Sequence, residues 1–210
     1  MRGLGLGEVV ASNRPDYRVG QIVQGLVGWQ QYAVASPAAP LMPVEVAEGV
    51  SPSAYLGVLG MTGLTAWVGI PTSASRSRGR RSWSRRRPDR SPAARQNVGG
   101  DIMDAIFARI NIGARVALCG LISGYNSADP PPWPHAFGNL LIQRATLQGF
   151  IVLDHFGRAQ EEITDIAGLN AEGKLTRLET VIEGFEQLPT AVNMLFDGKN
   201  VGKLVVNVSG

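Results

Sequence analysis

Short apolar segments separated by turn-forming residues dominate the beginning of the chain. Gly7 to Ser12 predicts a short strand and Gln21 to Val27 a second, with Pro15 and Gly20 marking a turn between them. A further apolar run from Tyr32 to Val34 continues the pattern. This part of the chain is therefore predicted to be β-rich.

Helical patterns appear at two later points. Ser51 and Pro52 form a typical helix start, with Ser51 as N-cap and Pro52 at the first helical position, and a helix could continue through Leu59. Asp101 is a plausible N-cap for a second helix, which we expect to end near Gly113. Its apolar and long side chains recur at helical spacing, at Ile102, Ala105, Ile106, Arg109 and Ile110.

Strands and helices then alternate to the end of the chain. Arg115 to Cys119 and Leu147 to Leu153 are short continuous apolar runs, which is typical of parallel strands buried on both faces. The predicted elements that follow are a helix, a strand, a helix stopped by Gly198 and a strand, over Ala159 to Ala171, Val181 to Phe185, Leu188 to Phe196 and Lys203 to Val208. This alternation predicts an α/β fold.

The segment from Pro71 to Gln96 has a different composition. It holds nine Arg, six Ser and one acid, Asp89, so its formal charge is +8, whereas the rest of the chain carries −5. It lacks the apolar residues needed for a core. Three interpretations remain open: a solvated disordered tract, a patch that binds nucleic acid or anionic lipid, and a shifted reading frame of a GC-rich gene, which we favour.

Composition limits the chemistry. Cys119 is the single cysteine, which excludes an internal disulfide and suggests a reducing compartment, and no secretory signal is visible at the start of the chain, so we expect a cytoplasmic protein. His135 and His155 lack metal-ligand spacing, so no metal is expected. Pro52 to Thr72 is uncharged and long enough to span a bilayer, but a buried helix explains it as well.

Four segments resemble the zinc-independent medium-chain dehydrogenase/reductases of the prostaglandin reductase and alkenal reductase group. They occur in the family's order and span about two thirds of the chain. In sequence they are the helix motif GMTGLTAW at 60–67, the turn NVGG at 97–100, the loop CGLISGYN at 119–126 with a proline-rich stretch after it, and the closing strand GKNVGKLVV at 198–206.

The resemblance implies a partial GroES-like β domain followed by the C-terminal half of a Rossmann-type parallel sheet. The boundaries that it predicts are 1–52 for the remnant of the catalytic domain, 53–70 for a connecting helix, 71–96 for the irregular segment, 97–170 for an incomplete nucleotide-binding domain and 171–210 for the return to the catalytic domain. It also implies a homodimer, in which a strand near Leu147 to Leu153 pairs with its symmetry mate.

The cofactor that the resemblance implies is NADP(H), and the reaction is hydride transfer to an α,β-unsaturated ketone or aldehyde, or to a quinone. Tyr125 would face both substrate and cofactor ribose. The residues carried over to the cofactor site, mostly at its nicotinamide end, are Asn97, Cys119, Gly120, Leu121, Ile122, Ser123, Gly124, Tyr125, Phe150, Ile151, Val152 and Asn200.

The chain departs from the family where the phosphates of a dinucleotide would be held. The glycine-rich turn AAxGAVG, and the Lys and Tyr that read the adenosine ribose phosphate, belong between Ile70 and Asn97, and none is matched. Only the last two strands of a six-stranded nucleotide domain are predicted, and the resemblance begins within the catalytic domain. Three functions remain open: a reductase, a non-catalytic remnant, and a protein whose Arg/Ser segment binds nucleic acid or membrane.

Overall fold

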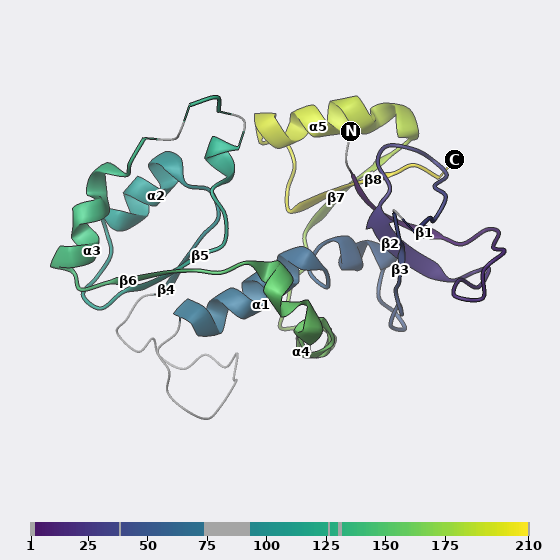
Figure 1. The fold of residues 1–210 in the computed structure, drawn as a ribbon, viewed down its shortest axis with the longest axis horizontal. Helices are drawn as coiled ribbons and strands as arrows, with labels where there is room; N and C mark the ends of the chain where they lie inside the picture. Colours follow the sequence, from purple (N-terminus) through teal and green to yellow (C-terminus); the bar gives the residue numbers. More distant parts are fainter. Residues whose placement is uncertain (1–2, 38, 74–92, 126, 130–131, 210) are drawn as a thin grey trace. The chain divides into compact units, whose positions relative to one another are not determined.

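The computed structural model describes residues 3–37, 39–73, 93–125, 127–129 and 132–209. The chain divides into two compact units, the first formed by Met1–Thr62 with Ile163–Gly210 and the second by Gly63–Glu162. The described residues form both strands and helices, and two of their three sheets contain parallel strands (Figure 1). The predicted α/β class is therefore confirmed.

The first unit contains two small sheets. One is antiparallel in the order β1–β2–β3, and the other is a parallel pair whose crossover contains helix α5. Its strands and helices are β1 (Leu4–Glu8), β2 (Ile22–Leu26), β3 (Met42–Pro43), the 3-10 helix η1 (Pro52–Leu56), β7 (Glu179–Glu183), the 3-10 helix η5 (Phe185–Gln187), α5 (Leu188–Asp197) and β8 (Lys203–Asn207).

The core of this unit forms where η1 meets helix α4 (Ala159–Ala171), which the division between the units crosses. Ala54, Tyr55, Leu59 and Ile166 are buried together there. The Tyr55 hydroxyl donates to the carbonyl of Glu45 at 2.9 Å, so even the polar end of this buried ring is paired. Leu6 of β1 packs against this cluster, which therefore connects the antiparallel sheet with η1 and α4.

Several predictions for this unit need correction. The first strand runs from Leu4 to Glu8 and does not extend to Ser12; beyond it Val9 alone is still paired, its amide donating to the Gln21 carbonyl and its carbonyl accepting the Gly20 amide, each at 2.9 Å. The apolar run Tyr32 to Val34 is no strand, and its side chains are exposed. The predicted helix after Ser51 is the shorter η1, and the Ser51 hydroxyl pairs with that of Ser53 and does not cap the helix.

The second unit is built on a parallel sheet of three strands. Helices α2 and α3 lie together on one side of it (Figure 1). Its elements are α1 (Met61–Ser73), β4 (Ala93–Gln96), α2 (Gly100–Phe107), β5 (Arg115–Leu118), the 3-10 helices η2 (Ile122–Gly124) and η3 (His135–Gly138), α3 (Asn139–Ile142), β6 (Thr146–Gly149) and the 3-10 helix η4 (Val152–Arg158).

Both ends of the Arg/Ser segment are more regular than predicted. Helix α1 continues through Ser73, and the third parallel strand, β4, runs from Ala93 to Gln96, directly before the NVGG turn. Gln96 is buried and pairs in register with Leu118 of β5. The prediction that 71–96 is irregular throughout is therefore wrong at its two ends. Residues 74–92, on which its disordered and shifted-frame interpretations depend, lie outside the described residues.

Three other boundaries also differ. Helix α2 begins after Gly99, so Asp101 lies in its first turn and is no N-cap, and α2 ends at Phe107, well before Gly113. Strand β6 ends at Gly149, and η4 replaces the predicted continuation through Leu153; the residues of β6 are half-buried or exposed because β6 lies at the edge of the sheet. None of the helices in the described ranges is long and apolar enough to cross a bilayer.

Candidate functional site

The three parallel strands of the second unit end at the same level. Gln96 of β4, Leu118 of β5 and Gly149 of β6 are partners in register. Asn97, Cys119 and Phe150 follow these strand ends directly, so three segments that the resemblance assigned to one site leave the sheet at one edge. The carboxyl edge of a parallel sheet is the usual place for a ligand in folds of this class.

Main-chain hydrogen bonds lock the first two of these segments together. The amides of Ile122 and Ser123 donate to the carbonyls of Asn97 and Val98, at 3.1 and 2.9 Å. The amide of Cys119 donates to the Gln96 carbonyl at 2.9 Å, as the strand pairing continues into the loop. The turn at 97–100 and the loop at 119–125 therefore form one surface.

Two glycines allow this close approach. Gly99 has a φ of 79°, which a residue with a side chain rarely adopts, and a Cβ there would lie 3.0 Å from the Ser123 hydroxyl. Gly120 has no such backbone restriction, but a Cβ on it would overlap the side-chain oxygen of Asn97. The glycines of the two motifs are explained by the contact between the turn and the loop.

Asn97 and Tyr125 converge on Gly120. The Tyr125 hydroxyl lies 3.4 Å from the place of a Gly120 Cβ, and it accepts a long hydrogen bond from the Leu121 amide, also at 3.4 Å. The Tyr125 side chain is 68% exposed, and Asn97 is exposed as well. The side-chain amide of Asn97 and the phenol of Tyr125 thus lie on an exposed surface beside the main chain of Gly120.

The third predicted segment, Phe150 to Val152, is partly used for packing. Phe150 and Val152 pack against the apolar cluster of α1, which consists of Leu64, Trp67 and Val68. The side chain of Ile151, between them, is exposed. The alternation places Ile151 away from the α1 cluster, while Phe150 and Val152 anchor the segment.

Asn200, the remaining predicted site residue, belongs to the first unit. Its side-chain amide donates to the Gly202 carbonyl at 3.0 Å within the approach to β8. Gly202 has a φ of 69°, and a Cβ there would overlap the Leu178 carbonyl. The local role of Asn200 is to shape this turn, as is common for asparagine.

The sequence motifs did not include Gln96, a buried polar residue of this edge. Its side-chain oxygen accepts the amides of Asn97 and Val98, each at 2.9 Å. The sequence signal for this role was a polar residue directly before the Asn-Val-Gly-Gly turn. It was missed because Gln96 ends a segment that has no apolar pattern.

A second feature missed from the sequence ties α2 to the proline-rich stretch. The Asp104 carboxylate accepts the Ala136 amide at 2.9 Å, and this bond lowers the pKa of Asp104 below its usual value, although burial opposes the shift. Phe137 packs edge-on against the buried Phe107. The segment after the loop is therefore fixed on α2.

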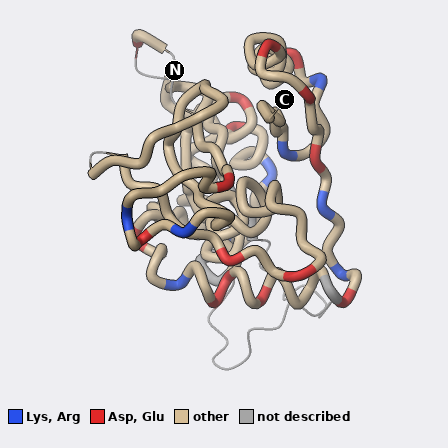
Figure 2. Tube along the Cα trace, turned by 90° about the vertical axis from the view of Figure 1, so that its right-hand side faces the viewer, with Lys and Arg blue, Asp and Glu red and all other residues tan. Residues whose placement is uncertain are grey.

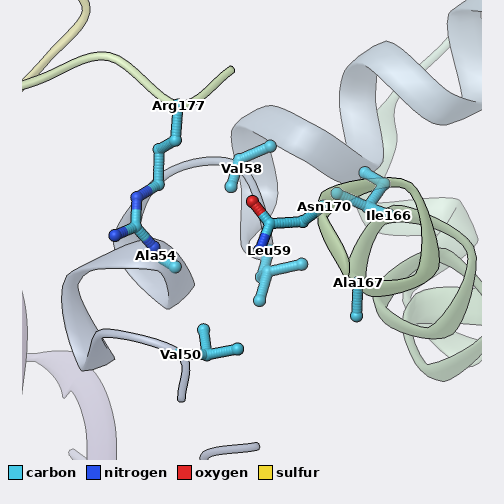
Figure 3. A pocket seen from close by; sticks show the side chains of 8 residues that line it. All are labelled: Val50, Ala54, Val58, Leu59, Ile166, Ala167, Asn170 and Arg177. Atoms are coloured by element: carbon cyan, nitrogen blue, oxygen red, sulfur yellow. The ribbon is translucent and has the colours of Figure 1, made fainter. Parts of the chain in front are cut away.

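The first unit contains a separate apolar hollow, shown in Figure 3. The residues that line it are Val50, Ala54, Val58, Leu59, Ile166, Ala167, Asn170 and Arg177. Arg177 forms an ion pair with Glu179 at 3.3 Å, and Glu179 accepts the Ser53 hydroxyl at 2.7 Å. These polar groups are used within the unit, and none of the predicted site residues lines the hollow.

Charged side chains and side chains able to bind metals are distributed over the described residues. Figure 2 shows acidic and basic residues of the described chain scattered along the trace. In the ranges that the structure covers, no group of three or more His, Cys, Asp or Glu side chains is placed to hold a metal ion.

Comparison with known proteins gives consistent results. A family model described as the N-terminal domain of oxidoreductase matches residues 1–44. The chain is 26% identical to a 2-alkenal reductase (NADP(+)-dependent) of Nicotiana tabacum, covering 99% of this chain and 77% of that protein. It is 28% identical to the NADPH-dependent curcumin reductase of Escherichia coli, covering 100% and 78%.

Among solved structures, CurA from Vibrio vulnificus in complex with NADPH matches with a TM-score of 0.77 and 29% identity, over 100% of this chain and 80% of that one. The alignment with the tobacco protein extends over 265 positions, 55 more than the 210 residues of this chain. The relative therefore has at least 55 residues without a counterpart within the aligned part of this chain.

Proposed function

Because the chain belongs to the zinc-independent medium-chain dehydrogenase/reductases, with GroES-like and Rossmann-type parts, we propose that its site derives from an NADP(H)-dependent reductase of α,β-unsaturated ketones and aldehydes. In this chain the site retains the part that faces the nicotinamide, and its NADPH affinity and turnover are strongly reduced. The arrangement at the carboxyl edge of β4, β5 and β6 carries this proposal.

The residues at this edge fit one end of a dinucleotide. Asn97 offers an exposed side-chain amide, and the loop around Gly120 offers backbone that a flat ring can approach closely. Ile122 and Ile151 add exposed apolar surface. We propose that these residues, with the others predicted from 119 to 125, hold the nicotinamide and its ribose.

The other end of the cofactor has no matching group in the sequence. A dinucleotide fold holds the pyrophosphate on a glycine-rich turn at a helix N-terminus, and no AAxGAVG turn occurs in the chain. The surplus of at least 55 aligned positions in the tobacco relative supports the loss of a substantial internal piece. Each missing charge-assisted hydrogen bond costs about 1.5 to 3 kcal/mol, so three or four of them reduce affinity by several factors of ten.

NADPH, when bound, supplies a hydride to the β-carbon of an α,β-unsaturated ketone or aldehyde, or to a quinone. The chain's own contribution is to stabilise the charge that develops on the substrate oxygen. Tyr125 is the group suited to this role, because its oxygen accepts the Leu121 amide while its proton remains available to a substrate. We assign it the role of hydrogen-bond donor to that oxygen.

The test is a fluorescence titration with NADPH together with consumption of an enone and a quinone by the full chain. We expect no measurable turnover and, at most, binding that is weaker than micromolar. Micromolar binding with turnover would mean that another part of the chain replaces the glycine-rich turn, and would establish a working reductase.

We also propose partners and a location for the chain, based on its similarity to these reductases. A homodimer formed through β6 would cover an open sheet edge, and the small-molecule substrate enters from solvent. The single cysteine agrees with a reducing, cytoplasmic location. We do not favour nucleic acid as partner, because Trp83 is the sole aromatic residue among the arginines of 71–96 and stacking on bases needs such residues.

A further inference from the structure

Gln96 occupies an unusual position for an uncharged polar residue. It is the last residue of β4 and its exposed fraction is 1%. Its side-chain oxygen accepts two hydrogen bonds, but its side-chain nitrogen has no partner among the described residues. A buried hydrogen-bond donor without a partner is unfavourable. The hydrogen bonds that the side-chain oxygen accepts must therefore account for the presence of a glutamine at this position.

The oxygen serves the turn that follows. The amides of Asn97 and Val98 both point back to it, at 2.9 Å each, so the chain is forced to bend immediately after the strand. On the other side of the same two residues, their carbonyls accept the amides of Ile122 and Ser123. Every main-chain polar group of Asn97 and Val98 is therefore fixed, the donors by Gln96 and the acceptors by the loop.

The main chain of Gln96 makes a second connection. Its carbonyl accepts the Cys119 amide at 2.9 Å and the Cys119 thiol at 3.4 Å. Gln96 thus contacts both the turn and the start of the loop. Both contacts lie directly beside Asn97, whose side-chain oxygen occupies the place of a Cβ on Gly120.

We propose that Gln96 is a positioning residue of the cofactor-facing edge, whose side-chain oxygen holds the 97–99 turn and so aims the Asn97 amide. The inference rests on the proposed function for the identity of the ligand, but the geometry of the turn can be tested without one. Gln96 would touch neither substrate nor cofactor, since it is buried beneath the turn.

The variants are Gln96→Leu, which removes the acceptor, and Gln96→Glu, which retains an acceptor oxygen at the same distance from the backbone. Gln148→Leu is the matched control, because Gln148 lies exposed on β6 of the same sheet. Amide hydrogen exchange of Asn97 and Val98, followed by NMR on the full chain, reports on the turn. Shifts of the Asn97 and Gly120 signals on titration with NADPH to millimolar concentration report on the ligand.

We expect Gln96→Leu to accelerate exchange of the two amides by about tenfold or more, and to weaken NADPH binding by about tenfold, corresponding to one hydrogen bond or more. Gln96→Glu should restore both the slow exchange and the NADPH binding, and Gln148→Leu should change neither.

A merely structural role of Gln96 would lower the melting temperature without rescue by Gln96→Glu. Unprotected Asn97 and Val98 amides in the parent chain, or unchanged exchange in Gln96→Leu, would overturn the proposal. If the parent amides are protected and respond as expected but NADPH causes no shifts, the proposed function fails and the role of Gln96 in the turn is retained.

Discussion

The side-chain oxygen of Asn97 occupies the space in which a side chain at Gly120 would begin. A Cβ on Gly120 would overlap this oxygen, and it would also lie 3.2 Å from the Asn97 carbonyl oxygen and 3.4 Å from the Tyr125 hydroxyl. The two residues come from different strand ends, β4 and β5, that are adjacent in the sheet. The absence of a side chain at Gly120 is thus the condition for bringing Asn97 next to Tyr125.

Gly120→Ala should therefore disturb the edge of the sheet specifically. We expect Asn97 to rotate away from residue 120 and the chain to lose about 1 to 3 kcal/mol of stability, as is usual when a methyl group is forced into occupied space. Denaturant unfolding and the NMR signals of Asn97 would measure both effects. Gly157→Ala is the control, because a Cβ at Gly157 meets nothing within 4 Å. Equal stability of the two variants would contradict the contact.

Glu162 should make stability depend on pH. Its exposed fraction is 1%, one of its carboxyl oxygens has no partner among the described residues, and burial raises its pKa from 4.5 to about 8. Between these values the folded chain retains a proton that the unfolded chain has lost. Stability from this group is therefore complete below pH 4.5 and falls as the pH rises toward 8, by at most about 1.4 kcal/mol per unit.

Glu162→Gln removes this titration. We expect the variant to be more stable than the parent by about 1 to 3 kcal/mol at pH 8, with a smaller difference near pH 5, since the neutral amide need not ionise. Urea unfolding at several pH values measures it. Glu161→Gln is the neighbouring control, because Glu161 is exposed and pairs with Arg158 at the surface. Parallel pH curves for the parent and Glu162→Gln would disprove a buried neutral carboxyl.

The sequence predicted some elements well because their signals are local. Helix α4 begins and ends as expected, and α5 is followed by Gly198 with a φ of 65°, the left-handed conformation that a C-terminal glycine favours. Strand β4 was missed because Ala93 to Gln96 has no apolar pattern. Its place is determined by pairing with β5, about twenty residues later, which no local signal contains.

The candidate site shows the same limit. The motifs predicted that Asn97 and the 119–125 loop act together, and the structure places them at one edge. Gln96 was not predicted, because its importance comes from burial and from two hydrogen bonds to the turn, and neither is visible as a residue type. The motifs contain the exposed residues of this edge, whereas the buried Gln96 beneath them is recognised only from its contacts in the fold.

Arg144 is the one residue other than glycine with a positive φ in the described chain, 50°. It ends the turn after α3, where the Ala145 amide donates to the Leu140 carbonyl at 2.9 Å. The left-handed conformation costs about 1 to 2 kcal/mol for a residue with a Cβ. Glycine avoids this cost, but part of the gain is lost because glycine also makes the unfolded chain more flexible. We expect Arg144→Gly to stabilise the chain by about 0.5 to 1 kcal/mol in thermal unfolding. Arg109→Gly, at an exposed position without a positive φ, should destabilise it, and the opposite order would contradict the backbone assignment.

The open edge of β6 offers a test of the proposed homodimer. The amides of Thr146 and Phe150 donate to carbonyls on the β5 side, at 2.8 and 3.0 Å. Since alternate residues of a parallel strand face the same neighbour, the amides of Leu147 and Gly149 point away from the sheet. A symmetry-related strand would satisfy these amides.

Light scattering of the parent chain at tens of micromolar should therefore give about twice the mass of the 22.4 kDa chain. Gly149→Pro deletes an outward amide without removing a bond to β5, so we expect it to shift the protein toward monomer while the sheet remains folded. Gly149→Ala retains the amide, and its Cβ would approach nothing closer than the Leu118 carbonyl at 4.0 Å, so it should remain dimeric. A well-folded monomeric parent, or a dimer that Gly149→Pro leaves intact, would show that β6 does not pair across a two-fold axis.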